Sequence, residues 1–106
     1  MIATALALLL GPSRLQVGAD EYHLTLSRPS LRAGAAVVQL VDFGQDGHDL
    51  ALRRLAPGSR TLLIREVRPG RVGELDARLA PGRYALWCTL ADHRARGMRA
   101  TLLVRR

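Results

Sequence analysis

Hydrophobic and polar residues alternate along most of the chain from residue 14 onward. In one such stretch, Tyr22, Leu24 and Leu26 alternate with polar residues. A period of two places every second side chain on the same face of an extended strand, so the pattern predicts strands with one buried face. The strands expected from this pattern span residues 15–19, 22–27, 35–43, 48–53, 60–67, 72–79, 84–88 and 98–105.

Turn-forming residues separate these stretches at intervals of about ten residues. Pro57-Gly58, Pro69-Gly70 and Pro81-Gly82 each lie between two alternating stretches, and the prolines leave little room for long helices. Strands this short must pack as two sheets over one core. We therefore expect an all-β fold, a Greek-key β-sandwich of about seven to eight strands.

The length of 106 residues fits one domain with a single hydrophobic core. Hydrophobic residues make up 48% of the chain and charged residues 24%. Disordered proteins are rich in charged residues and poor in apolar ones, so this composition excludes disorder as the main description of the chain. We assign residues 14–106 to the sandwich domain and residues 1–13 to a separate apolar N-terminal segment.

The N-terminal segment has the character of a signal peptide or membrane anchor. Residues 2–10 read IATALALLL, a run of signal-peptide length that is too short to span a bilayer. We interpret it as the remnant of a signal or anchor, which predicts a periplasmic, secreted or membrane-anchored protein. Val17-Gly18-Ala19 resembles a cleavage site of the small-x-small kind, but the alternation favours a first strand there.

The chain is strongly basic, with a formal net charge of +7. All sixteen basic residues are arginine, a bias that a genome rich in G and C would produce. A basic surface still attracts acidic partners through long-range electrostatic steering. Aromatic residues make up only 4% of the chain and the arginines are dispersed, which argues against nucleic acid as a partner.

Three residues with metal-binding side chains lie around the last connection of the chain. Cys88 shares the inward parity of Leu86, and Met98 begins the next strand facing inward, so both sulfur atoms are expected at the same end of the core. His93 lies between them in the connecting loop, and Gly97 gives the backbone freedom to turn. The loop can therefore bring a thiol, an imidazole and a thioether together.

A second imidazole comes from His48, which the alternation places inward with Leu50 and Leu52 at the start of a strand. Two imidazoles, a thiolate and a thioether form a donor set that suits copper in either oxidation state better than magnesium or calcium. Zinc would accept the cysteine and the histidines but rarely recruits a thioether. The candidate metal ligands are His48, Cys88, His93 and Met98.

These residues resemble the cupredoxins, the blue copper proteins. A Pro-Gly turn, a strand with aromatic residues that leads into Cys88, a short loop to His93 and a Gly-Met pair before the last strand follow one another as in that family. The loop that leads to His48 is similar as well, and the resemblance covers residues 17–104. It implies one mononuclear type 1 copper held by the four candidate ligands. It also implies a monomer that is not an enzyme and that shuttles single electrons between protein redox partners, with His93 as the exit.

Three features depart from the family's pattern. The loop of four residues between Cys88 and His93 is longer than in plastocyanin and closer to rusticyanin-like and sulfocyanin-like members. Asp49 follows His48 where many members have asparagine, which puts in doubt the hydrogen bond that ties the two ligand loops together. Asp42 likewise replaces an asparagine in the preceding strand.

Other interpretations of the same residues stay open. A copper carrier or tolerance protein would use the same ligands to deliver the metal, and a sandwich that binds no metal would serve as an interaction domain. Arg94, Arg96 and Arg99 flank His93 and form either a docking site for an acidic redox partner or a solvated charged loop. His23 lies on the outward face of its strand and is interpreted as a surface residue.

Overall fold

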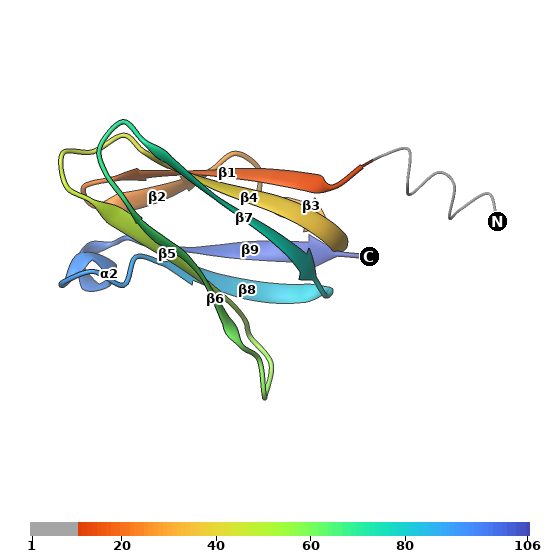
Figure 1. Cartoon of the computed structure of the whole chain (residues 1–106). Helices are drawn as coiled ribbons and strands as arrows, with labels where there is room; N and C mark the ends of the chain where they lie inside the picture. Colours follow the sequence, from red (N-terminus) through yellow and green to blue (C-terminus); the bar gives the residue numbers. More distant parts are fainter. Residues whose placement is uncertain (1–10) are drawn as a thin grey trace.

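The structure is a computed structural model that describes residues 11–106, so the apolar run at residues 2–10 lies outside the described residues. The described part folds as two β-sheets packed face to face (Figure 1). Within it, no helix has the length and apolar character needed to cross a membrane. The all-β sandwich expected from the alternation is confirmed.

The first sheet contains four strands in the order β2-β1-β4-β7. These strands are β1 (Ser13–Asp20), β2 (His23–Leu26), β4 (Gly34–Asp42) and β7 (Val72–Leu79). β1 runs parallel to β4, whereas the two edge strands pair antiparallel with their neighbours. On β4, Ala36, Val38 and Leu40 are buried while the residues between them are partly exposed, as the period of two predicts.

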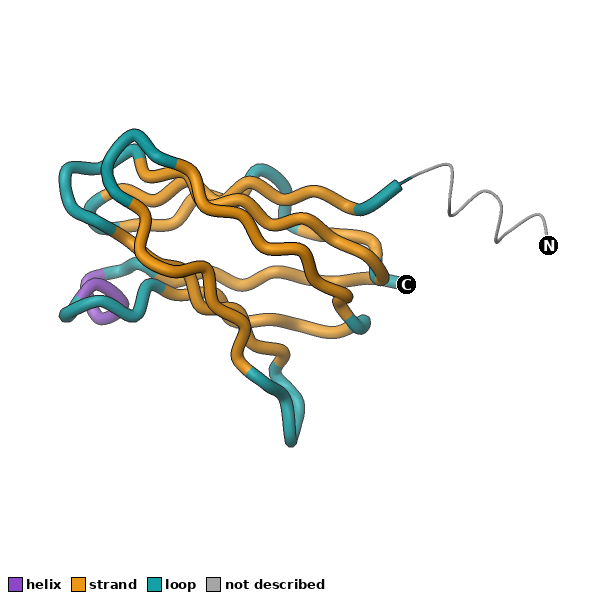
Figure 2. Tube along the Cα trace, viewed as in Figure 1, coloured by secondary structure: helices purple, strands orange, loops and turns teal. Residues whose placement is uncertain are grey.

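The second sheet contains five strands in the order β3-β9-β8-β5-β6. These strands are β3 (Ser30–Arg32), β5 (His48–Arg54), β6 (Thr61–Val67), β8 (Gly82–Trp87) and β9 (Arg99–Arg105). β3 runs parallel to β9, and all other neighbours are antiparallel. The tip of the β5–β6 hairpin extends beyond the body of the sandwich (Figure 2).

The hydrophobic core fills the space between the sheets. Val17 on β1 and Leu102 on β9 have no exposed surface, and Leu52 on β5 is 1% exposed. Burying one such side chain contributes roughly 1.5–3 kcal/mol to folding. The core therefore fixes both sheets, and with them the inward parity of Cys88, which directly follows β8, and of His48, which begins β5.

Two details differ from the sequence-based expectation. Residues 11–106 form nine strands rather than seven to eight, because the short β3 lies between residues 27 and 35, where the alternation predicted no strand. Three residues are too few to show a period, and β3 becomes a strand only through its pairing with β9. The last connection, expected to be a loop, contains the single helical turn α2 (His93–Arg96).

Of the connections at one end of the sandwich, three lie next to the candidate ligands. They are the turn between β1 and β2, the segment 43–47 between β4 and β5, and the connection between β8 and β9 that contains α2. Figure 1 shows this end opposite the C-terminus. All four candidate ligands belong to the second and third of these connections or to the residues that border them.

Candidate metal centre

Cys88 and Met98 lie opposite each other at the end of the β8–β9 pair. Cys88 continues the inward parity of Leu86, and neither Cys88 nor Met98 has exposed surface. The backbone N–H of Cys88 donates to the carbonyl oxygen of Met98 at 3.1 Å, which extends the ladder one step beyond Trp87 and Arg99. Both sulfur-containing residues are therefore buried at the same end of the core.

His93 starts α2 and is folded back toward Cys88. Its backbone N–H donates to the carbonyl of Leu90 at 3.1 Å, and its carbonyl accepts from the N–H of Met98 at 3.0 Å. The side chain is left 8% exposed. Gly97 closes the turn with a φ of 130°, and a Cβ there would lie 2.7 Å from the carbonyl oxygen of Tyr22. Only glycine allows this conformation and this close approach to the β1–β2 turn.

His48 is the first residue of β5 and has no exposed surface. Its Nδ1 lies 3.9 Å from Sγ of Cys88, and Nδ1 of His93 lies 3.5 Å from the same sulfur. The two imidazole ring centroids are 5.0 Å apart. One donor atom from each of the three residues lies within 4.8 Å of the other two. Because metal–ligand bonds to nitrogen and sulfur are about 2.0–2.3 Å long, small side-chain movements suffice for one ion to join all three.

Glu21 adds a carboxylate that the sequence analysis did not single out. Its Oε1 lies 2.8 Å from Nε2 of His48. The carboxylate also accepts hydrogen bonds from the backbone N–H groups of Gln45 at 3.0 Å and Asp46 at 2.8 Å. The backbone donors, Asp46 first, and then His48 lower the pKa of Glu21 to about 2. No spacing in the sequence signals this contact, because Glu21 lies in a turn 27 residues away from His48.

Asp49 joins the two ligand-bearing segments. Its Oδ1 accepts from the backbone N–H of Thr89 at 2.7 Å, and its Oδ2 accepts from the Thr89 hydroxyl. Thr89 directly follows Cys88, and Asp49 directly follows His48. The sequence put the link between the two segments in doubt, but the structure retains it, with the Asp49 carboxylate as the acceptor.

Asp42 is the second acid in a position where the family has an amide. It ends β4 and is 1% exposed. Its Oδ1 accepts from the backbone N–H of Gly44 at 2.8 Å, whereas Oδ2 has no hydrogen-bond partner among residues 11–106. Burial raises the pKa of Asp42, and the bond from Gly44 opposes this shift.

The donor set fits copper by its chemistry. Imidazole, thiolate and thioether are the ligand types that copper accepts in both of its common oxidation states. Burial raises the pKa of the Cys88 thiol, so a metal must displace the proton to bind the sulfur. The site is closed to bulk water on the side of His48 and Met98, which have no exposed surface.

Arginines cover the outer side of α2. The guanidinium of Arg94 lies 4.5 Å from the centroid of the Trp87 ring, and that of Arg96 lies 4.8 Å from the centroid of Tyr22. Nη1 of Arg99 donates to the carbonyl of Arg94 at 3.1 Å. The cation–π contacts hold an exposed rim of arginines next to the imidazole at the start of the helix, in which Arg96 is also ion-paired with Asp92 at 2.7 Å.

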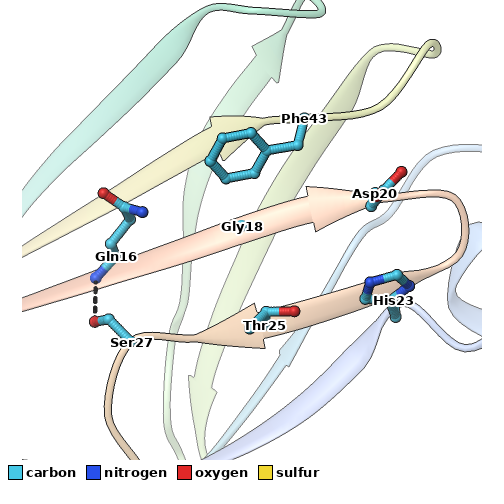
Figure 3. Close-up of a pocket in the computed structure, with 7 residues that line it drawn as sticks. All are labelled: Gln16, Gly18, Asp20, His23, Thr25, Ser27 and Phe43. Carbon is cyan, nitrogen blue, oxygen red and sulfur yellow. Dashed lines mark hydrogen bonds between the residues drawn. The ribbon is translucent and has the colours of Figure 1, made fainter.

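His23 lies apart from this cluster. It is exposed on β2 and lines a shallow pocket of about 310 Å³ on the outer face of the first sheet. Figure 3 shows the Phe43 ring lying over Gly18 in this pocket, where a Cβ on Gly18 would be 3.1 Å from the ring. The interpretation of His23 as a surface residue is confirmed.

Comparison with protein-family models and with curated protein sequences gives no match. Solved structures do match. Auracyanin B has a TM-score of 0.71 at 19% identity, with 91% of this chain and 91% of that chain covered. Auracyanin A, a "blue" copper protein from the green thermophilic photosynthetic bacterium Chloroflexus aurantiacus, has a TM-score of 0.70 at 14% identity, with 90% of this chain and 100% of that chain covered. Copper nitrite reductase from Nitrosomonas europaea has a TM-score of 0.63 at 17% identity, with 90% of this chain and 42% of that chain covered.

These likenesses extend over nine-tenths of the chain, although sequence identity is below one-fifth. A backbone shared at such low identity reflects a common arrangement of strands, and it leaves function to be argued from the site. The two-sheet topology and the likeness to these solved structures together identify the chain as a β-sandwich with the cupredoxin fold.

Proposed function

We propose that the chain binds one copper ion through His48, Cys88, His93 and Met98 in a type 1 site. The observation that carries this proposal is the convergence of two imidazole nitrogens on one buried thiol, at 3.5 Å and 3.9 Å. Met98 supports it as a fourth donor, because its backbone pairs with that of Cys88 and its side chain is fully buried. The structural likeness to a "blue" copper protein agrees with this donor set.

We infer that the site serves to carry electrons. Copper bound in such a set gains and loses one electron by cycling between Cu(II) and Cu(I) with little rearrangement of its ligands. The chain supports this by fixing the ligands, through Glu21 on His48 and through Asp49 across to Thr89. Four ligands from the protein leave no open position for a substrate, so we expect an electron carrier and not an enzyme.

His93 is the proposed exit for the electron. Among the four proposed ligands it is the one with exposed surface, at 8%. The exposed guanidinium groups of Arg94 and Arg96 lie on the same helical turn, and the chain has a net charge of +7. These charges support a protein redox partner with an acidic surface, which docks next to His93. We propose a monomer that works between such partners outside the cytoplasm.

Voltammetry of the copper-loaded full chain tests the proposal, combined with a competition against a Cu(I) chelator. An electron carrier gives a reversible one-electron wave and keeps its copper in both oxidation states. Ready loss of Cu(I) to the chelator would instead indicate a copper carrier. A folded chain that takes up no copper would indicate an interaction domain.

A further inference from the structure

The turn between β1 and β2 brings one carboxylate to the rear of the proposed site. Glu21 lies in this turn, and its side chain is 20% exposed. Its carboxylate accepts from the backbone N–H groups of Gln45 and Asp46 and lies 2.8 Å from Nε2 of His48. Two backbone N–H groups and one imidazole nitrogen of residues 45–48 therefore converge on the Glu21 side chain, which comes from the turn between β1 and β2.

Gly44 leaves the space that this carboxylate occupies. A Cβ at Gly44 would overlap both carboxylate oxygens of Glu21. The φ of Gly44 lies outside the left-handed region, so φ permits an alanine there, and the three atoms nearest to its Cβ would all belong to the Glu21 carboxylate. Hydrogen bonding and packing thus specify the same position for Glu21.

The contact decides which nitrogen of His48 is free. An ionised carboxylate only accepts hydrogen bonds, so Nε2 carries the hydrogen. In the neutral ring this leaves the lone pair on Nδ1, the nitrogen that lies 3.9 Å from Sγ of Cys88. The negative charge lies one imidazole ring away from that nitrogen, where it favours the more highly charged Cu(II) over Cu(I).

We propose that Glu21 is a positioning residue, which fixes the tautomer and ring orientation of His48 and lowers the reduction potential of the bound copper. The part that concerns the tautomer applies to the metal-free chain. The part that concerns the potential rests on the proposed function.

Nitrogen-15 NMR of the metal-free full chain shows which ring nitrogen of His48 is protonated. We expect the Nε2–H form in the wild type and a mixture of both tautomers in Glu21→Ala. Gly44→Ala should shift the mixture in the same direction without changing Glu21 itself. Glu66→Gln is the matched control, because the Glu66 carboxylate lies against Gly47 of the same segment and makes no hydrogen bond to His48. Pure Nε2–H in both Glu21→Ala and Gly44→Ala would overturn the proposal.

Reduction potentials of the copper-loaded variants test the effect of the charge. Glu21→Gln keeps the size of the side chain and removes its charge. We expect the ratio of Cu(I) to Cu(II) affinity to rise about tenfold, which is about 59 mV for one electron. The exposed Glu66→Gln should shift the potential less, and an equal shift in both variants would contradict a specific role for Glu21. A wild type that binds no copper would refute the proposed function, while the tautomer measurement would still decide the role of Glu21.

Discussion

The two connections that carry the imidazoles hold them in different ways. The segment between β4 and β5 leads to His48, whose fully buried ring is hydrogen-bonded to the Glu21 carboxylate. The connection between β8 and β9 carries His93, whose ring is 8% exposed and lies 5.4 Å from the Tyr22 ring, centroid to centroid. His93 is held through its backbone, by the bond from Met98, and within residues 11–106 it has no hydrogen bond to a carboxylate.

This difference gives the site a fixed side and an accessible side. Hydrogen bonds to an ionised group are roughly twice as strong as those between neutral groups, so His48 is the more firmly held of the two rings. His93 is held by aromatic packing and by a single helical turn, next to the exposed arginines. Partners and small ligands are therefore expected to reach the site from the side of His93.

Cys88 belongs to both sides, because its sulfur lies near Nδ1 of both imidazoles. We expect Cys88→Ser to abolish the strong thiolate-to-copper absorption completely, since an alcohol does not supply this bond. Absorption spectra after addition of Cu(II) measure the effect. His23→Ala is the control and should keep the colour, because His23 lies on the outer face of the other sheet. Loss of colour in His23→Ala would contradict the strand parity used to assign the ligands.

Removal of each imidazole in turn tests the comparison directly. His93→Gly and His48→Gly should both lose the wild-type spectrum. Added imidazole should restore it in His93→Gly at a concentration at least tenfold lower than in His48→Gly, because only His93 has exposed surface. A titration with imidazole followed by absorption gives both values. Equal or reversed concentrations would show that the two sides do not differ in access.

Met98→Leu tests the fourth donor, a buried residue that follows His93 in the connection between β8 and β9. Leucine has a similar volume, so the buried position should stay filled. We expect the variant to keep copper. Because a weak donor that favours Cu(II) is lost, the ratio of Cu(I) to Cu(II) affinity should rise about tenfold, which raises the reduction potential. Potentiometric titration measures the shift. An unchanged or lower potential would argue against the thioether as a ligand.

Asp42→Asn tests the side of the site that carries His48, through its effect on the free energy of unfolding. Burial raises the pKa of Asp42 in the folded chain. The folded chain therefore loses stability as the pH rises from about 3.9, the ordinary pKa of an aspartate, through this raised pKa. Asparagine carries no charge, so we expect it to stabilise the metal-free chain by about 1 kcal/mol at pH 7 and by less at pH 3. Urea unfolding at the two pH values measures both effects. The same gain at both would show that ionisation of Asp42 is not the cause.

The smallest expected effect concerns the arginine rim. Arg94→Gln combined with Arg96→Gln should leave the spectrum and potential nearly unchanged, because neither side chain is a proposed ligand. The variant should slow electron exchange with an acidic redox protein several-fold at low salt, and the difference should vanish at high salt. Stopped-flow kinetics at two salt concentrations measures this. Equal rates at low salt would make the rim a solvated charged loop, with no part in docking.

Strand parity is the part of the fold and site that the sequence predicts well. The alternation in β4 and β8 is local, and it survives in the structure because each strand has one face on the core. It carries one residue past the end of β8 to Cys88 and begins β5 at His48. Both residues are fully buried, as their parity predicts.

The remaining features depend on contacts between distant segments. The reach of Glu21 to His48 and the bonds of Asp49 to Thr89 depend on how turns approach one another across the sandwich, which periodicity does not encode. β3 exists only through its pairing with β9. The four residues of α2 are too few to show a helical pattern, since one turn takes about 3.6 residues.

The most direct test of the copper site is the absorption and electron paramagnetic resonance spectrum of the full chain with one equivalent of Cu(II). Four ligands as proposed predict an intense blue or green thiolate-to-copper band and a small copper hyperfine splitting. Cys88→Ser should lack both features. A colourless chain that is folded and holds no copper would contradict the account, and would make His48, Cys88, His93 and Met98 residues of the core alone.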